Sequence, residues 1–424
     1  MSKTYNTKRE EFYKPLRKDF WPELYDEEYS LYDVHLIAES EIQEIRTAAE
    51  RIDKIYTKFW SHLRTVSDEV LLQLDIPKEV LKFVRLKTLK DPAVIRRVDL
   101  IKTITGYVHC EVNWDTPTFI KELFNINGLV CKEFGVDNPN HGLEEKLASS
   151  IRNHVNEAFR SINGKGIPKV VFSAHGDSEE DFLTIKYLHE ISKIENSEVI
   201  PLEDLMVDDE GLYDSRGNKI DVLYRQTYPI EHMIYDIDIV DGIQYNSGLR
   251  ILNLVKEGKL AIINPPSAFL LQSKAVQAAI WAIYENHNEF PFFTDVERLW
   301  VKKYFLPTYL EEDVFLENKE KFVKKPSFGR EGDTIEIFDG ENNLIEAEKQ
   351  QNYTESIPVY QKFVELPKTT MQTLSGEKTN HVLMGCFVID GEGSALGIRA
   401  GNQITGNSSA FLPVGVKNIK NNLK

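Results

Sequence analysis

The sequence predicts a mixed α/β (α+β) fold, and three observations predict it. Residues 40–63 and 144–159 repeat apolar side chains every three or four positions, as amphipathic helices do. The short apolar runs 169–173 and 260–264 have the length and β-branched content of buried strands. Residues 96–114 alternate apolar and polar positions around a turn-like centre, which is typical of a β-hairpin. With 424 residues, the chain is long enough for two or three domains and a large core.

The composition of the chain argues against several classes of protein. Hydrophobic residues make up 42% of the chain and charged residues 28%, which is the range of ordinary globular proteins. The formal charge of −16 argues against a general nucleic-acid binder, since such a protein needs a basic face. Cys110, Cys131 and Cys386 are scattered and no cluster of cysteines and histidines occurs, so we expect neither a disulfide framework nor a structural zinc. The polar N-terminus and the lack of a long apolar stretch favour a cytoplasmic protein without membrane contact.

The chain begins with a segment of no clear period. Residues 1–36 are aromatic and charged and contain Pro15 and Pro22, so we expect an irregular arm packed on the body. The helix that follows is expected to be capped by Ser40. Shorter helices are predicted at 66–74 and 78–84.

The hairpin 96–114 carries a candidate metal site. If its turn is centred near Thr105, Asp99 lies opposite Glu111 and Arg97 lies opposite Asn113, all on one face. Carboxylate and amide oxygens are the ligands that Mg²⁺ prefers, and an arginine beside them suits a phosphate that shares the metal. A solvated hairpin face with one arginine–aspartate pair explains the same pattern without a site.

The region 169–191 reads as a strand, a polar loop and a helix. The loop His175–Ser178 follows the strand at its carboxyl end, which is a common ligand position in α/β folds. Ser178 could instead simply cap the helix, with Glu179 and Glu180 complementing the helix dipole. Further along the chain we expect the following elements: strands at 218–224 and 359–364, a helix containing Glu231, a helix at 272–284, no clear template for 286–313, and a hairpin at 382–399.

The stretch KFVKKPSFGREGDTI, residues 321–335, indicates two strands joined by a flexible loop. Gly329 and Gly332 bracket Arg330 and Glu331, and glycine lets backbone amides approach an anion. Lysine and arginine at the same place add positive charge for phosphate oxygens. A hairpin with a glycine-rich turn and solvated lysines is the alternative.

Taken together and in this order, the motifs resemble those of the glutathionylspermidine synthetase family of ATP-grasp ligases, over roughly residues 30–415. The resemblance rests on the following segments: Arg97 and Asp99 with Glu111 and Asn113, the acidic loop 177–181, Thr227 four residues before Glu231, Ser273-Lys274-Ala275, Lys325-Pro326 through Gly332, Tyr360-Gln361 with Leu366-Pro367, and Gly397-Ile398-Arg399. The match is to the synthetase part of the family, without the amidase domain of its bifunctional members.

The resemblance implies an ATP-grasp fold with an inserted pre-ATP-grasp-like α/β domain. We expect the following division: an N-terminal arm and helices at 1–90, the metal-bearing hairpin at 91–120, the α/β substrate domain at 121–260, and the nucleotide-binding region at 261–424.

The resemblance also implies an ATP- and Mg²⁺-dependent ligase that joins a carboxylate to an amine through an acyl phosphate. The residue roles that it implies are these: Asp99, Glu111 and Asn113 for the metal; Lys274, Lys325, Gly329, Arg330, Glu331, Gly332 and Gln361 for ATP; Arg97 and Arg399 for the transferring phosphoryl group; and Glu179, Glu180 and Thr227 for the substrate. Adenine is expected between strands near Val323 and residues 360–364.

The partners implied are a small-molecule or peptide carboxylate and an amine, for which a polyamine is one candidate; the oligomeric state is left open. Two departures bear on the substrates: Phe119 stands where bifunctional members have a cysteine near the glutathione site, and the segment 286–309 is longer than usual. Two other functions stay open, a non-catalytic nucleotide-binding or assembly protein and a ligase that modifies a protein or peptide tail.

Overall fold

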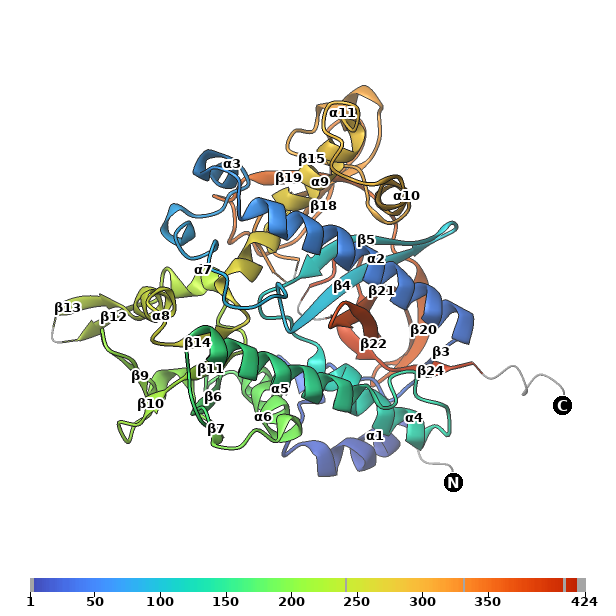
Figure 1. Ribbon diagram of the computed structural model, residues 1–424. Helices are drawn as coiled ribbons and strands as arrows, with labels where there is room; N and C mark the ends of the chain where they lie inside the picture. The colour runs from blue at the N-terminus through green and yellow to red at the C-terminus, as the bar shows by residue number, and fades with distance from the viewer. Residues whose placement is uncertain (1–3, 241, 331, 407–408, 418–424) are drawn as a thin grey trace.

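The computed structural model describes residues 4–240, 242–330, 332–406 and 409–417. It confirms the predicted mixed α/β class. An antiparallel sheet lies at the centre of the molecule, a second antiparallel sheet lies above it, and a parallel sheet with its helices lies below (Figure 1). No helix in the described part of the chain is long and apolar enough to cross a membrane.

The central sheet joins the predicted hairpin to the C-terminal strands. Its order is β23-β22-β21-β4-β5, and β20 pairs with the first half of β21. The strands are β4 Ile95–Thr103, β5 Gly106–Asn113, β20 Lys368–Thr373, β21 Gly376–Ile389, β22 Glu392–Gly401 and β23 Ala410–Leu412. Because β4 pairs with β21, the metal-candidate hairpin and the Gly397–Arg399 segment lie on one sheet despite nearly 300 residues between them.

Helix α2, Glu39–Leu63, packs its apolar stripe on this sheet. The stripe residues Ile45, Ile52 and Phe59 are buried as the spacing predicts. The predicted Ser40 cap is wrong, because the helix begins at Glu39 and Ala38 is its N-cap, without a side-chain bond. Glu39 and Glu41 in the first turn complement the helix dipole instead.

The second sheet is antiparallel and has the order β15-β19-β16-β17-β18. Its strands are β15 Thr308–Tyr309, β16 Phe322–Pro326, β17 Glu336–Phe338, β18 Leu344–Ala347 and β19 Pro358–Lys362. The glycine loop connects β16 to β17, as the strand–loop–strand interpretation predicts. Helix α9, Ala275–Glu285, packs against β15.

The third layer is a parallel sheet of order β14-β11-β6-β7. Its strands are β6 Val170–Ser173, β7 Ser197–Val199, β11 Val222–Arg225 and β14 Ala261–Ile263, and its flanking helices include α5 Leu143–Ser161, α6 Glu179–Ser192 and α8 Ser247–Lys256. From β6 the chain moves to β7 on one side and then returns to β11 on the other. The loops that leave β6 and β11 therefore meet at the point where the strand order reverses, which is the usual ligand position in open α/β sheets.

Two segments that gave no clear pattern contain helices. The N-terminal arm, expected to be irregular, forms α1 Tyr5–Tyr13, which buries Arg9 and Tyr13. Within 286–313, α10 Asp295–Tyr304 starts with a capping box in which Thr294 and Glu297 bond each other's backbone. The Thr-x-x-Glu signal was present in the sequence, but the short apolar period behind it was too weak to indicate a helix.

The remaining elements are short. They are α3 Asp68–Gln73, a π-helical turn Glu122–Ile126, α4 Asn127–Glu133, α7 Ile230–Met233, α11 Asp313–Glu317, the 3₁₀ turns Lys14–Leu16, Lys78–Val80, Leu202–Asp204 and Pro266–Leu271, and strands β1 Glu23–Leu24, β2 Glu27–Glu28, β3 His35–Ile37, β8 Met206–Val207, β9 Leu212–Tyr213, β10 Lys219–Ile220, β12 Ile237–Val240, β13 Ile243–Asn246 and β24 Val414–Val416. Because β24 pairs in parallel with β3, the end of the described chain lies beside the N-terminal arm. The division of the chain into four predicted domains stays a prediction.

Candidate functional site

A cavity lies where the three layers meet, and most of the predicted site residues line it. The central sheet contributes Arg97, Asp99, Glu111, Asn113 and Arg399 to its wall. The second sheet contributes Lys325 and Gln361, and its glycine loop contributes Arg330 and Gly332. Glu180 and Thr227 face the cavity from the parallel layer. Lys274, Gly329 and Glu179 are not among the lining residues, and Glu331 lies outside the described residues.

A β-bulge sets the geometry of the hairpin. In the four pairs next to the turn, from Thr103 with Gly106 to Leu100 with His109, the strands keep one register. If that register continued, Asp99 would lie opposite Cys110. One extra residue, Cys110, then interrupts β5, and the register shifts so that Asp99 pairs with Glu111 and Arg97 with Asn113. The predicted pairing is confirmed. It depends on the bulge, since without it Glu111 would move to the opposite face.

Arg97 and Asp99 form a buried ion pair on the cavity face of β4. The guanidinium donates to both carboxylate oxygens of Asp99, at 2.7 Å and 3.0 Å. It also donates to the backbone carbonyl of Thr118 at 2.9 Å. Arg97 is 5% exposed and Asp99 is 2% exposed, so each charge depends on the other for its compensation.

Glu111 has a different partner. The ammonium of Lys274 lies 3.4 Å from its carboxylate and donates to the backbone carbonyl of Gly329 at 2.8 Å. Burial raises the pKa of Glu111, but the positive charges of Lys274, Lys325 and Arg97 outweigh burial, and the net effect lowers the pKa. Glu111 is therefore an anion in the cavity at neutral pH, and Lys274 lies within reach of the site although it does not line the wall.

Lys325 extends from β16 towards the bulge. Its ammonium donates to Gln361 Oε1 at 2.8 Å and to the backbone carbonyl of Cys110 at 3.2 Å. Only 7% of Lys325 is exposed, and burial lowers the pKa of its ammonium from the usual value. Lys325 and Gln361 thus act as one unit, because pairing of β16 with β19 places the two side chains side by side.

The glycine loop is held against the other two layers. Arg330 donates to Glu231 at 3.2 Å and to the Thr116 hydroxyl at 3.3 Å. Gly332 has φ of +76°, and a Cβ at this position would lie 2.9 Å from the backbone carbonyl of Thr405. Only glycine fits both that dihedral angle and that approach, so the loop can cover the cavity closely.

The parallel layer forms the third wall at the point where its strand order reverses. Thr227, in the loop after β11, has φ of +47° and donates its hydroxyl to Asp181 on α6. Ser178 is the N-cap residue of α6, as predicted, but its hydroxyl donates to the other carboxylate oxygen of Asp181 at 2.8 Å and accepts no backbone bond. Glu180 faces the cavity, whereas Glu179, one position earlier on the helix, is exposed.

Several residues at the site were not predicted from the sequence. Tyr29 and Tyr25, from the N-terminal arm, line the cavity beside Glu180 and Arg399. The arm has no periodic pattern, so no sequence signal placed it there. Tyr29 donates to Glu122, a fully buried carboxyl whose pKa is raised by burial.

A buried ion pair fastens the hairpin to the parallel layer. Arg225, the last residue of β11, donates to both oxygens of Asp115, and neither side chain is exposed. Arg225 also donates to the backbone carbonyl of Tyr228 at 2.8 Å, which shapes the loop that carries Thr227. This pair therefore positions residues from two walls of the cavity relative to each other.

Apolar side chains also line the cavity: Ile101, Leu306, Val323, Ile335, Ile337, Val364, Leu366 and Leu383. Val323, Gln361 and Val364, which lie in the region predicted for adenine, are among the lining residues. The cavity thus combines apolar and charged lining groups, as a site for a heterocyclic phosphate compound requires.

Comparison with known proteins gives three findings. The family model described as glutathionylspermidine synthase preATP-grasp matches residues 9–417. A Haemophilus influenzae protein, to which an acid–amine ligase activity is provisionally ascribed, is 26% identical over 239 residues. These residues are 55% of this chain and 52% of the relative, so the match spans about half the length of each.

A solved structure has the same overall fold. It is a glutathione synthetase-like effector from Globodera pallida in its apo form, with a TM-score of 0.56 and 12% sequence identity. The similarity covers 91% of this chain and 89% of that one. Together with the family match, it confirms the predicted ATP-grasp-like α+β fold.

Proposed function

Since the chain belongs to the glutathionylspermidine synthase preATP-grasp family, we propose that it is an ATP- and Mg²⁺-dependent acid–amine ligase. It forms an amide bond between a carboxylate and an amine through an acyl phosphate. The observation that carries this proposal is the meeting of three oxygen-ligand residues (Asp99, Glu111 and Asn113) with Lys274 and Lys325 around one cavity.

The donor set of the hairpin fits Mg²⁺. Two carboxylates and one amide on the same face of β4 and β5 offer hard oxygen ligands, and Mg²⁺ completes its shell with water and phosphate oxygens. When bound, the metal offsets the negative charge of the phosphates and polarises the phosphoryl group that is transferred.

The charges of the cavity are balanced within the protein, in a way that suits an anionic ligand. Each acidic metal candidate lies beside a cation with a predicted phosphate role: Asp99 beside Arg97, and Glu111 beside Lys274. With metal and triphosphate bound, the carboxylates would face the metal and the cations would face the phosphates. None of these four side-chain charges would then be left buried without a partner.

The chain's own residues supply the remaining steps. Lys325, held by Gln361 and the Cys110 carbonyl, donates to phosphate from the second sheet. The glycine loop, anchored through Arg330, closes over the phosphoryl group and excludes the water that would hydrolyse an acyl phosphate. Glu180 and Thr227 hold the substrate amine at the reversal point of the parallel sheet, and Arg399 steadies the phosphoryl group from the central sheet.

Calorimetric titration of Mg-ATP tests the nucleotide site. We expect binding to the unmodified protein and roughly 10- to 100-fold weaker binding to Lys325→Met, which loses one charge-assisted hydrogen-bond donor. Lys324→Met is the matched control. Lys324 is the residue before Lys325 on β16, but its side chain points to the other face of the sheet, where it pairs with Glu336 at 2.9 Å. The affinity of Lys324→Met for Mg-ATP should therefore equal that of the unmodified protein.

A screen for ADP release with pairs of carboxylates and amines then tests catalysis. ADP release that requires both substrates supports the ligase. Mg-ATP binding without turnover for any pair favours the non-catalytic nucleotide-binding protein. A folded protein that does not bind Mg-ATP, or equal binding by Lys325→Met and Lys324→Met, contradicts the proposed site.

A further inference from the structure

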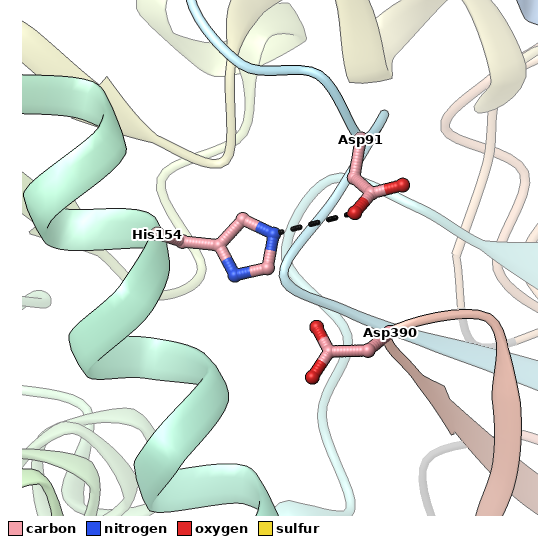
Figure 2. A group of neighbouring side chains, drawn as sticks. All are labelled: Asp91, His154 and Asp390. Atoms are coloured by element: carbon pink, nitrogen blue, oxygen red, sulfur yellow. Dashed lines mark ion pairs between the residues drawn. The ribbon is translucent and has the colours of Figure 1, made fainter.

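Away from the cavity, three elements bring Asp91, His154 and Asp390 together (Figure 2). Asp91 lies in the loop before β4, His154 on α5, and Asp390 in the turn between β21 and β22. One potential ligand atom from each side chain lies within 4.8 Å of the other two. Figure 2 shows the imidazole on one side and the two carboxylates approaching it from separate segments.

Ser150, one turn before His154, orients two of the three side chains. Its backbone carbonyl lies 2.8 Å from His154 Nδ1, and its hydroxyl donates to Asp390 Oδ1 at 2.8 Å. A carbonyl oxygen can only accept, so Nδ1 donates to it, and Nε2 is the ring nitrogen that faces Asp91. Histidines that bind metals show this arrangement, in which the second ring nitrogen donates to a backbone carbonyl that fixes the ring.

The distance between His154 and Asp91 also suits a shared ion. His154 Nε2 and Asp91 Oδ2 are 3.7 Å apart, which is too long for a hydrogen bond. Two ligands bound tetrahedrally to one ion with bonds of about 2.1 Å lie about 3.4 Å apart. The observed separation therefore needs only a small contraction to hold a metal.

The local charge balance favours a divalent cation. Arg96, the arginine closest in sequence to Asp91, already donates to both oxygens of Asp53 and to the backbone carbonyl of Ala93, and Lys90, the residue before Asp91, is exposed to solvent. The charge of Arg96 is therefore compensated within its own contacts, and Asp91 and Asp390 place two carboxylates beside the imidazole of His154. His154 is only 5% exposed, whereas 45% of the Asp91 side chain is exposed, which leaves an open approach from solvent.

We propose that Asp91, His154 and Asp390 bind a divalent transition-metal ion of the Zn²⁺ type, with water in the remaining position. One imidazole and two carboxylates suit such an ion without any cysteine, whereas the expectation of no structural zinc rested on the lack of clustered cysteines and histidines. The ion fastens α5 of the parallel layer to the β21–β22 hairpin of the central sheet. This inference is independent of the proposed ligase function.

Zn²⁺ titration into the full chain, after treatment with a chelator and without nucleotide, tests the site. We expect one Zn²⁺ per chain, a rise in the melting temperature, and a Co²⁺ absorption spectrum typical of nitrogen and oxygen ligands. Asp390→Asn and His154→Gln should each weaken Zn²⁺ binding at least about tenfold, and Ser150→Ala about tenfold through loss of orientation. Asp390 lies in an exposed turn, so its variant tests the site even if His154→Gln does not fold.

His175→Gln is the matched control. Among the described residues, His175, Asp177 and Glu203 form the other group of three His, Cys, Asp or Glu side chains that could hold a metal, and replacing His175 should leave the tight Zn²⁺ site intact. The proposal is overturned if the chain takes up no Zn²⁺ at micromolar concentration, which would leave His154 and Asp91 as a plain ion pair. It is equally overturned if both Asp390→Asn and His154→Gln bind Zn²⁺ as the unmodified chain does, or if only His175→Gln loses it.

Discussion

Asp99→Asn should destabilise the fold much more than Glu111→Gln, although both carboxylates are assigned to the same metal. The replacement keeps the shape of the side chain and removes its charge. Arg97, which is 5% exposed, then remains buried with only neutral hydrogen-bond partners, such as the Thr118 carbonyl. Removing one partner of a buried ion pair typically costs about 3–5 kcal/mol of the free energy of unfolding.

Glu111 provides the comparison. Its side chain is 24% exposed, and the Lys274 ammonium at 3.4 Å keeps its bond to the Gly329 carbonyl when the carboxylate is replaced. The stability change for Glu111→Gln should therefore be that of a partly solvated pair, about 0–1 kcal/mol. Both replacements should weaken Mg-ATP binding, so loss of binding and loss of stability are separable in the pair of variants.

Urea unfolding of five proteins measures the effect: the unmodified chain, Asp99→Asn, Glu111→Gln, Arg97→Met, and the double variant with Asp99→Asn and Arg97→Met. Because the double variant buries no unpaired charge, its loss of stability should be smaller than the sum of the single losses by about 0.5–3 kcal/mol. The reasoning is refuted if Asp99→Asn is as stable as Glu111→Gln, or if the two single losses simply add.

Two further outcomes follow from the structure. Glu180→Gln should raise the KM for the amine substrate, whereas Glu179→Gln should not, because only Glu180 faces the cavity. Steady-state kinetics with both variants measures the difference. Equal KM values for the two variants would show that Glu180 does not bind the amine. Burial, with a contribution from Lys325, lowers the pKa of His109 from 6.5 to about 3, so the unfolded chain binds a proton that the folded chain does not between these values. Stability should therefore fall as the pH drops from 6.5 towards 3, by up to about 1.4 kcal/mol per pH unit from this residue. Unfolding curves of His109→Gln at several pH values should show a correspondingly smaller fall, and an unchanged fall would contradict the assignment.

Much of the fold was predictable because local physics determines it. The 3.6-residue period of 40–63 and the alternation of 96–114 are imposed by burying one face of a helix or strand, and both elements form as predicted. The N-terminal helix was missed because its buried residues, Arg9 and Tyr13, pack through polar and aromatic contacts that leave no apolar period. The metal candidates were predicted to share a face, but the bulge at Cys110 that places them there has no signal in the sequence.

The sequence by itself determined the kinds of chemistry present: oxygen ligands on a hairpin, lysines beside a glycine loop, and a polar loop after a buried strand. Only the tertiary structure decided which of these groups meet. Lys325 reaches the carbonyl of Cys110 across 215 positions, and Arg225 reaches Asp115 across 110. Such pairs form only when whole sheets pack together, so they depend on the strand order and on how the layers are stacked. Neither of these is encoded by a hydrophobic period along the chain. For the same reason Asp91, His154 and Asp390, which are separate and unremarked in the sequence, become a cluster only when α5 packs beside the β21–β22 turn.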